Sequence, residues 1–121
     1  IRRLCHHCRE PYTPGEESLI SLCLEKKNKY TFHKLAGCSL CRRTGYLGRS
    51  VITELLLLTP AIGNLIMAGE TADTIKAAAR KGGMTTLRES AVRKVVAGET
   101  TVEEVFRVTM PDQDIGKNTE A

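Results

Sequence analysis

Two pairs of cysteines constrain the fold of this chain more than any other feature of its sequence. Each pair has two residues between its members, and 29 residues separate the pairs; the four residues are Cys5, Cys8, Cys38 and Cys41. A two-residue spacing lets both sulfur atoms of a tight turn point at one ion, and two such turns complete a tetrahedral set of zinc ligands. The spacing therefore predicts one Zn²⁺ ion bound by these four thiolates. Disulfide bonds and a redox-active pair are the alternatives.

The predicted ion would serve the fold rather than a reaction. Four sulfur ligands leave zinc no open position for water or a substrate, and such closed sites are structural. The first 58 residues have few large apolar side chains, so a zinc ion that fastens the chain near Cys5 to the turn near Cys41 would replace part of a core. His6 and His7 are interpreted as turn residues, because four thiolates already complete the ligand set.

The remaining candidates for chemistry give no second site. Cys23 is interpreted as a small buried side chain on a helix, and His33 as a surface residue of a strand. The sequence has no GxxxxGK[ST] phosphate loop, no cysteine–histidine or serine–histidine–aspartate set, and no aromatic-and-basic RNA-binding motif. We therefore predict no catalytic residue and no cofactor-binding residue other than the metal ligands.

Composition places the chain among cytoplasmic globular proteins. It has 121 residues, 41% of them hydrophobic and 26% charged, and no apolar run reaches the roughly 18 residues that a membrane span needs. Five cysteines without an N-terminal export signal indicate the reducing cytoplasm. Because the sequence begins at Ile1, we expect it to be part of a longer protein.

The formal net charge of +4 is weak evidence for nucleic-acid binding. Four thiolates around one Zn²⁺ ion add two negative charges, which leaves about +2. Cations near the cysteines in sequence favour the deprotonated thiols that a metal requires; they are Arg2, Arg3, Arg9, Lys34, Arg42 and Arg43. We expect these bases to serve the metal site or a solvated face.

The chain changes character near Thr59, and the predicted fold class is α+β. Residues 1–58 hold all five cysteines and form a small tetracysteine zinc subdomain with a helix and short strands. Residues 59–109 predict a mainly α-helical subdomain of about four short helices, and residues 110–121 predict a flexible tail.

Local signals place the elements of the first part. Thr13 can cap a helix and Glu16 can complete a capping box, so we predict a helix that continues to about Lys27. Loose alternation predicts a strand over residues 30–35, and an apolar run after a glycine turn predicts another over residues 49–58.

Each helix predicted in the second part has a start and a stop signal. Threonines suited to capping precede apolar residues at helical spacing; they are Thr59, Thr71, Thr86 and Thr100. The third and fourth threonines are followed three positions later by Glu89 and Glu103, which predicts a capping box in each. Glycines end the first three helices, at Gly69, at residues 82–83 and at Gly98.

Two segments resemble a known family. The run IRRLCxxC over residues 1–8 and the run GCxxCxxTGYxGR over residues 37–49 are similar to the C-terminal region of type II secretion and type IV pilus assembly ATPases. Residues 51–56, 83–88 and 98–105 resemble the same family, and the whole resemblance extends to about position 109.

The resemblance implies a cytoplasmic, hexameric, nucleotide-driven motor at the inner membrane that assembles pilin-like subunits. In such proteins ATP and Mg²⁺ are bound upstream of the cysteine subdomain, so this chain is expected to be a non-catalytic part of an ATPase. The implied partners are the parent's nucleotide-binding domain, neighbouring subunits and inner-membrane platform proteins. The chain would be peripheral to the membrane rather than spanning it, and would bind no nucleic acid.

The hypothesis is therefore a zinc-binding C-terminal portion of a secretion or pilus-assembly ATPase that braces the motor core and offers an interaction surface. The alternative from another class is a stand-alone zinc-ribbon module that binds nucleic acid, with which the positive charge and cysteine pairs are compatible. A thiol-redox enzyme would need one cysteine pair free of metal.

Overall fold

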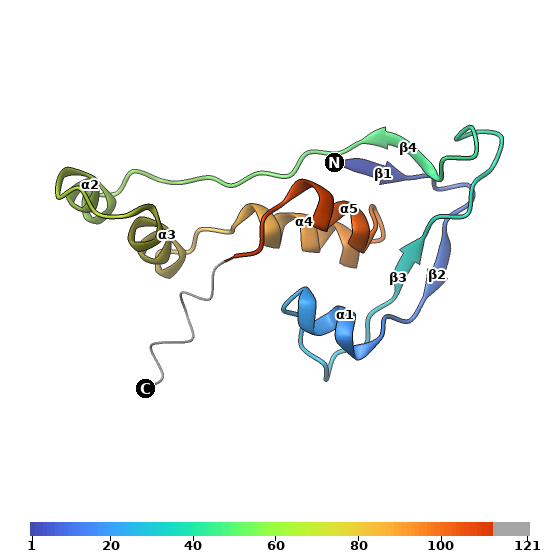
Figure 1. The fold of residues 1–121 in the computed structure, drawn as a ribbon, viewed down its shortest axis with the longest axis horizontal. Helices are drawn as coiled ribbons and strands as arrows, with labels where there is room; N and C mark the ends of the chain where they lie inside the picture. The colour runs from blue at the N-terminus through green and yellow to red at the C-terminus, as the bar shows by residue number, and fades with distance from the viewer. Residues whose placement is uncertain (113–121) are drawn as a thin grey trace.

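The computed structural model describes residues 1–112, which form short strands and helices of an α+β fold, as predicted (Figure 1). The strands are β1 (Arg2–Leu4), β2 (Glu10–Tyr12), β3 (Phe32–Lys34) and β4 (Tyr46–Arg49). The helices are α1 (Glu16–Ser21), α2 (Pro60–Met67), α3 (Ala72–Lys81), α4 (Leu87–Val96) and α5 (Val102–Val108).

The strands form two antiparallel pairs, in which the outer strands pair together and the inner strands pair together. β1 pairs with β4, with Arg2 opposite Arg49, and the register shifts between Arg2 and Leu4. β2 pairs with β3, with Tyr12 opposite Phe32. The turn from β1 to β2 and the connection from β3 to β4 each carry one cysteine pair, so this pairing brings both turns to one end of the molecule (Figure 1).

The predicted helices of the second part are confirmed, and their starts follow the capping signals. The side chains of Thr59, Thr71 and Thr86 each accept a hydrogen bond from the amide three residues on. Glu89 completes the capping box at the start of α4. These signals lie within one helical turn, which explains why the sequence alone locates them.

The start of α5 differs from the prediction by one residue. Thr101, not Thr100, caps this helix and accepts from the amide of Glu104. The hydroxyl of Thr100 instead donates to the backbone oxygen of Arg2 at 2.8 Å. The side chain of Thr100, which the local pattern predicted as the cap, therefore makes a long-range contact instead.

Within residues 1–58, the predicted helix and the second predicted strand are both longer than the elements in the structure. α1 has only six residues; it begins after Gly15 without a side-chain cap, so the predicted capping box of Thr13 and Glu16 does not form. The strand predicted over residues 49–58 is limited to Tyr46–Arg49, and residues 50–58 belong to no ladder among the described residues. Ile1, the residue before β1, lies beside Ser50, so no described strand is available to pair farther along.

One core of buried side chains joins elements on both sides of Thr59. It contains Leu19 and Leu22 from α1 and just after it, Phe32 from β3, Ala91, Val92 and Val95 from α4, and Val102 and Val105 from α5. Phe32 is fully buried, and Tyr12 meets its ring edge-on at 6.1 Å between centroids. The division of the chain at Thr59 stays a prediction, and the packing ties α4 and α5 to the first part.

Polar contacts make the same connection at the base of the cysteine turns. The amide of Leu4 donates to the backbone oxygen of Glu99 at 2.8 Å, beside the bond from Thr100 to Arg2. The carboxylate of Glu104, which is fully buried, accepts from both the backbone and the guanidinium of Arg2. β1 is therefore fixed to the turn between α4 and α5.

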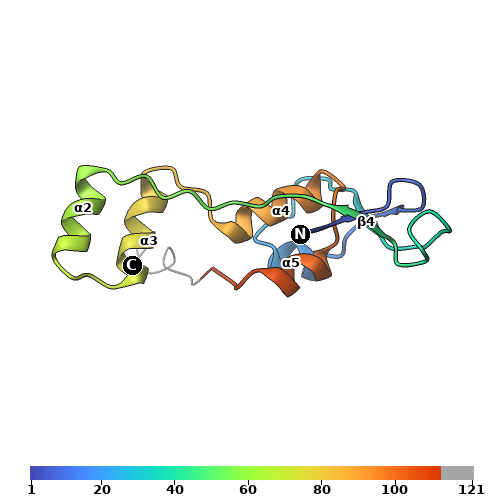
Figure 2. The same cartoon turned by 90° about the horizontal axis from the view of Figure 1, so that it is seen from above.

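The helices α2 and α3 pack together at the end of the molecule opposite the cysteine turns (Figures 1 and 2). An extended segment, residues 50–59, runs along α4 to reach α2. Among residues 1–112, no helix has both the length and the apolar character that crossing a bilayer requires. Asp112 accepts from Lys76 at 2.9 Å and from Thr86 at 2.6 Å. Residues 113–121 of the predicted tail lie outside the described residues.

Candidate metal centre

The first cysteine turn follows directly from β1. Cys5 is the residue after this strand, and its amide donates to the backbone oxygen of Gly45 at 2.8 Å, across from the second turn. The backbone oxygen of Cys5 then accepts from the amides of Cys8 and Arg9. These bonds close a tight turn that holds the sulfur atoms of Cys5 and Cys8 on one side.

The second cysteine turn is closed by backbone hydrogen bonds of its own. The backbone oxygen of Cys38 accepts from the amide of Arg43 at 2.8 Å, and that of Cys41 accepts from Thr44 at 3.1 Å. Arg42 and Arg43 both have positive φ angles, of 54° and 65°. This left-handed conformation is unusual for residues other than glycine, and it turns the chain back toward β4 just after Cys41.

The four sulfur atoms form one cluster, and three of the distances between them are those of a tetrahedral zinc site. All lie within 4.8 Å of one another, and the measured pairs are 3.8 Å for Cys5–Cys38, 3.8 Å for Cys8–Cys41 and 3.7 Å for Cys38–Cys41. A tetrahedron with Zn–S bonds of about 2.3 Å has edges of about 3.8 Å. A disulfide would need sulfur atoms about 2.05 Å apart. The residues present therefore fit a zinc ion and not a pair of disulfides.

Backbone amides point at the sulfur atoms from the same turns. Gly37 donates to the sulfur of Cys8 at 3.3 Å, while Cys38 and Gly45 donate to that of Cys41 at 3.3 and 3.2 Å. Such donors stabilise negative charge on a ligand and fix its orientation. The site thus has a second set of groups that favours thiolates.

Gly45 is required by its position between the two turns. Its φ is +78°, and a Cβ atom here would lie 2.7 Å from the side chain of Leu35. The missing side chain allows the backbone of Gly45 to contact Cys5 and Cys41 at once. Any larger residue would push Leu35 away or move one of the turns.

The thiols differ in how readily they ionise. Burial opposes ionisation of Cys41, but hydrogen bonds from the amides of Cys38 and Gly45 outweigh it and lower its pKa to about 6. Burial raises the pKa of Cys8 to about 12, and the neighbouring thiols of Cys38, Cys41 and Cys5 add to the rise. Without a metal the cluster therefore keeps a proton at Cys8, which a divalent ion must displace.

Comparison with known proteins assigns the chain to a family. Residues 1–107 match the family model described as type II/IV secretion system protein. The chain belongs to this family. The match includes both cysteine turns and four of the five helices in full, so the family assignment covers the candidate metal centre.

Individual relatives agree with the family assignment. The chain is 41% identical over 112 residues to the type IV pilus assembly ATPase PilB of Thermus thermophilus. These aligned residues make up 91% of this chain and 13% of that protein. It is 35% identical over 109 residues to the type II secretion system protein HxcR of Pseudomonas aeruginosa, covering 90% and 20%. It is 39% identical over 111 residues to the type II secretion system protein E of Dickeya dadantii, covering 90% and 21%. The chain spans less than a quarter of the length of these relatives.

The other residues that the sequence singled out are not part of the four-sulfur cluster. His6 and His7 are exposed, and the ring of His6 contacts Arg3 at 3.1 Å. Cys23, predicted to be buried, is exposed and has a φ of 57°, because the helix that was to bury it ends at Ser21. His33, predicted on the surface, is half-buried.

Two of the basic residues expected to serve the metal site or a solvated face bind the helices instead. Arg2 binds the carboxylate of Glu104 and stacks over the ring of Tyr46 at 4.2 Å. Arg9 donates to the backbone oxygen of Gly98 at the end of α4. Sequence proximity to the cysteines was misleading, because both side chains are directed toward the helices.

Proposed function

We propose that this chain is the zinc-binding, non-catalytic C-terminal portion of a cytoplasmic secretion or pilus-assembly ATPase. In this proposal ATP and Mg²⁺ bind to a separate nucleotide-binding domain of a longer, hexameric protein, and Zn²⁺ is structural. The observation that carries the proposal is the set of four sulfur atoms, three pairs of which are separated by the edge length of a zinc–thiolate tetrahedron.

Zinc bound at this site would supply a closed cross-link between two turns that are distant in sequence. The chain's own residues would do the rest. The thiolates of Cys5, Cys8, Cys38 and Cys41 bind, and the amides of Gly37, Cys38 and Gly45 hold the sulfur charge. With four sulfur ligands no position is left for a substrate, which supports a structural role.

A bracing role for the metal centre is supported by its connections to the helices. β1 leads straight into Cys5, and the same strand is bonded to Glu99, Thr100 and Glu104 around the start of α5. Arg9, one residue after Cys8, is bonded to Gly98. Movement of the cysteine turns would therefore be transmitted to α4 and α5, and a rigid metal site would hold these helices in place.

The helical end would provide the interaction surface for neighbouring subunits or the inner-membrane platform proteins, with the chain peripheral to that membrane. Large apolar side chains of α2 support this role. Ile66 is 48% exposed and Met67 is 88% exposed. A surface of this kind is common where a protein meets a partner.

The proposal is tested in the longer ATPase by comparing Cys38→Ser with Cys23→Ser. We expect Cys38→Ser to lose zinc and to lose secretion or pilus assembly, since removal of one of four thiolates opens the coordination shell. ATP binding should persist, because no residue of this chain belongs to the nucleotide site. Cys23→Ser is the matched control, because Cys23 is exposed and outside the cluster.

Two outcomes would contradict the proposal. One is full transport by a Cys38→Ser protein that has been shown to contain no zinc. The other is loss of ATP binding by Cys38→Ser while the protein remains folded, which would place this chain in the nucleotide site.

A further inference from the structure

The segment between β4 and α2, residues 51–58, has the sequence and exposure of a strand without its partner. It runs extended along the molecule (Figure 2), yet it belongs to no ladder among the described residues. Five of its apolar side chains are exposed: Val51 by 73%, Leu55 by 71%, Leu56 by 45%, Leu57 by 67% and Leu58 by 74%. The continuous apolar run over residues 55–58 is long enough for a strand inside a sheet.

The ladder between β1 and β4 reaches the start of this segment and fixes its register. The amide of Ser50 donates to the backbone oxygen of Ile1 at 2.8 Å, and the amino group of Ile1 donates to that of Ser50 at 3.1 Å. These two residues thus form a hydrogen-bonded pair of an antiparallel ladder. In such a ladder the next hydrogen-bonded pair lies two residues on, which makes Ile52 the next position to face the partner strand.

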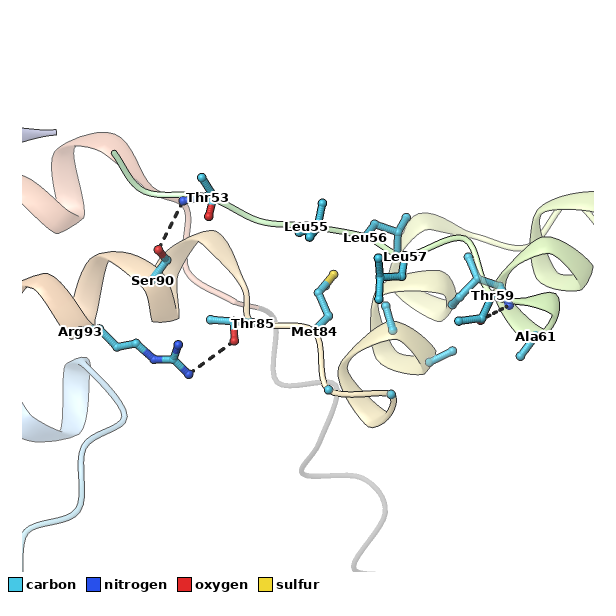
Figure 3. Close-up of a pocket in the computed structure, with 15 residues that line it drawn as sticks. Thr53, Leu55, Leu56, Leu57, Thr59, Ala61, Met84, Thr85, Ser90 and Arg93 are labelled. Carbon is cyan, nitrogen blue, oxygen red and sulfur yellow. Dashed lines mark hydrogen bonds between the residues drawn. The ribbon is translucent and has the colours of Figure 1, made fainter. Parts of the chain in front are cut away.

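The direction of the following amides agrees with this register. The amide of Thr53 points the other way and donates to the hydroxyl of Ser90 on α4 at 3.3 Å (Figure 3). The alternation then places the N–H and C=O groups of Ile52, Glu54, Leu56 and Leu58 on the edge that continues from β1. Among residues 1–112, none of these groups has a hydrogen-bond partner.

Two side chains of the segment already contact the rest of the molecule. The carboxylate of Glu54 accepts from the amide of Leu87 at 2.7 Å, and Ile52 packs against the hydrophobic core. The segment also borders a groove of about 490 Å³, into which Figure 3 shows the side chain of Met84 projecting. Contacts with α4 therefore fix the segment at Thr53 and Glu54 and leave one of its edges open.

We propose that residues 51–58 form a β-strand whose partner is the stretch of polypeptide that precedes Ile1 in the longer protein. That stretch would continue β1 in antiparallel register past Ser50, and its backbone would satisfy the open edge. The proposal rests on the proposed function in one respect, that the chain is part of a longer ATPase. Two of the relatives are much longer than this chain, which covers only 13–20% of their length.

A second copy of this chain is a poorer occupant of the same edge. The edge is continuous with β1, so a strand from another molecule would have to begin directly against Ile1 without a gap. A strand that continues from Ile1 meets no such restriction, and closing it costs little entropy because its end is already in place.

The direct test is residue-resolved amide hydrogen exchange in this 121-residue chain and in the longer ATPase. We expect the amides of Ile52, Glu54, Leu56 and Leu58 to exchange at least about tenfold more slowly in the longer protein. The amides of Leu55 and Leu57 should change less. Equal exchange at the even-numbered positions in both proteins would overturn the proposal.

Proline substitutions provide a matched pair for the same readout. Leu56→Pro removes an amide from the proposed ladder, whereas Leu55→Pro removes one that faces away from it. In the longer protein we expect Leu56→Pro to abolish protection at Glu54 and Leu58, and Leu55→Pro to weaken it less. Equal effects of the two substitutions would contradict the register. The unsubstituted proteins keep the test valid if either variant does not fold.

Two further measurements separate the possible failures. If the even-numbered amides become protected in the 121-residue chain with rising concentration, and sedimentation shows a dimer, the occupant is a second copy and the proposal is overturned. Zinc content of the same samples reports on the proposed function separately. Even-numbered protection in a protein that binds no zinc would support the strand while refuting the metal centre.

Discussion

The carboxylate of Glu104 offers a sharp test of how the two parts of the chain are joined. Its side chain is fully buried between α5 and β1. It accepts from the backbone amide of Arg2 at 3.1 Å and from two guanidinium nitrogens of Arg2 at 3.1 and 2.7 Å. Arg107 donates to it from two nitrogens, at 3.0 and 2.6 Å. One carboxylate thus holds the base of the first cysteine turn against the last helix.

The loss of unfolding free energy on replacing this carboxylate by an amide follows from these contacts. Breaking a buried ion pair typically costs about 3–5 kcal/mol, because it leaves a charge buried alone. Here both arginine side chains are about half exposed and regain water, so the cost falls toward that of lost charged hydrogen bonds, about 2 kcal/mol. Glu104→Gln should therefore lower the free energy of unfolding by about 2 kcal/mol and the melting temperature by about 8 °C.

The same carboxylate gives a pH dependence of known sign. Hydrogen bonds from Arg107, and then from Arg2, outweigh burial and hold the pKa of Glu104 well below its usual range. A group whose pKa is depressed by folding contributes stability above its unfolded pKa and loses it as pH falls below about 4.3. The difference between wild type and Glu104→Gln should therefore shrink on acidification below that pH.

Urea unfolding followed by circular dichroism measures both effects. The comparison uses the difference between variants, so that loss of metal at low pH affects both proteins alike. Glu103→Gln is the control, because that carboxylate is exposed on the same helix. A Glu104→Gln protein within about 0.5 kcal/mol of wild type at pH 7 would refute the reasoning, since ordinary surface substitutions fall in that range.

Three further predictions concern the core, the metal and ATP. Phe32→Ala should cost about 3–5 kcal/mol and increase amide exchange in α4 as well as β3, because the ring is fully buried in the shared core; unchanged exchange in α4 would mean that the two parts pack independently. Zinc should bind more weakly at pH 6 than at pH 8 in a chelator competition, because the Cys8 thiol, with a pKa of about 12, must lose its proton; equal affinity would rule out thiolate ligation by Cys8. The 121-residue chain alone should not hydrolyse ATP in a phosphate-release assay, because its sequence has no phosphate loop; turnover abolished by a substitution within the chain would contradict this.

The features that sequence reasoning located are those fixed within a few residues. The CxxC spacing and the capping threonines Thr59, Thr71 and Thr86 act within single turns, and the structure places both cysteine turns and the helices accordingly. The pairing of β1 with β4 was not predicted, although it is what brings the two turns together. Nothing in three residues of sequence identifies a partner more than 40 positions away.

The errors have a common physical origin in long-range contacts. Thr100 did not cap α5 because its hydroxyl binds Arg2, and Arg2 does not serve the metal because it binds Glu104. Residues 49–58 were predicted as a strand from their apolar content, which is real, but a strand also needs an edge to pair with. The short α1 left Cys23 exposed, where helix periodicity had placed it inside.

X-ray absorption at the zinc edge, combined with the metal content of the purified chain, tests the central claim most directly. We predict one zinc per chain with four sulfur neighbours at about 2.3 Å, bound by Cys5, Cys8, Cys38 and Cys41. Absence of zinc from metal-replete protein would contradict the account. So would a shell of mixed sulfur and nitrogen, which would make His6 or His7 a ligand in place of one of the cysteines.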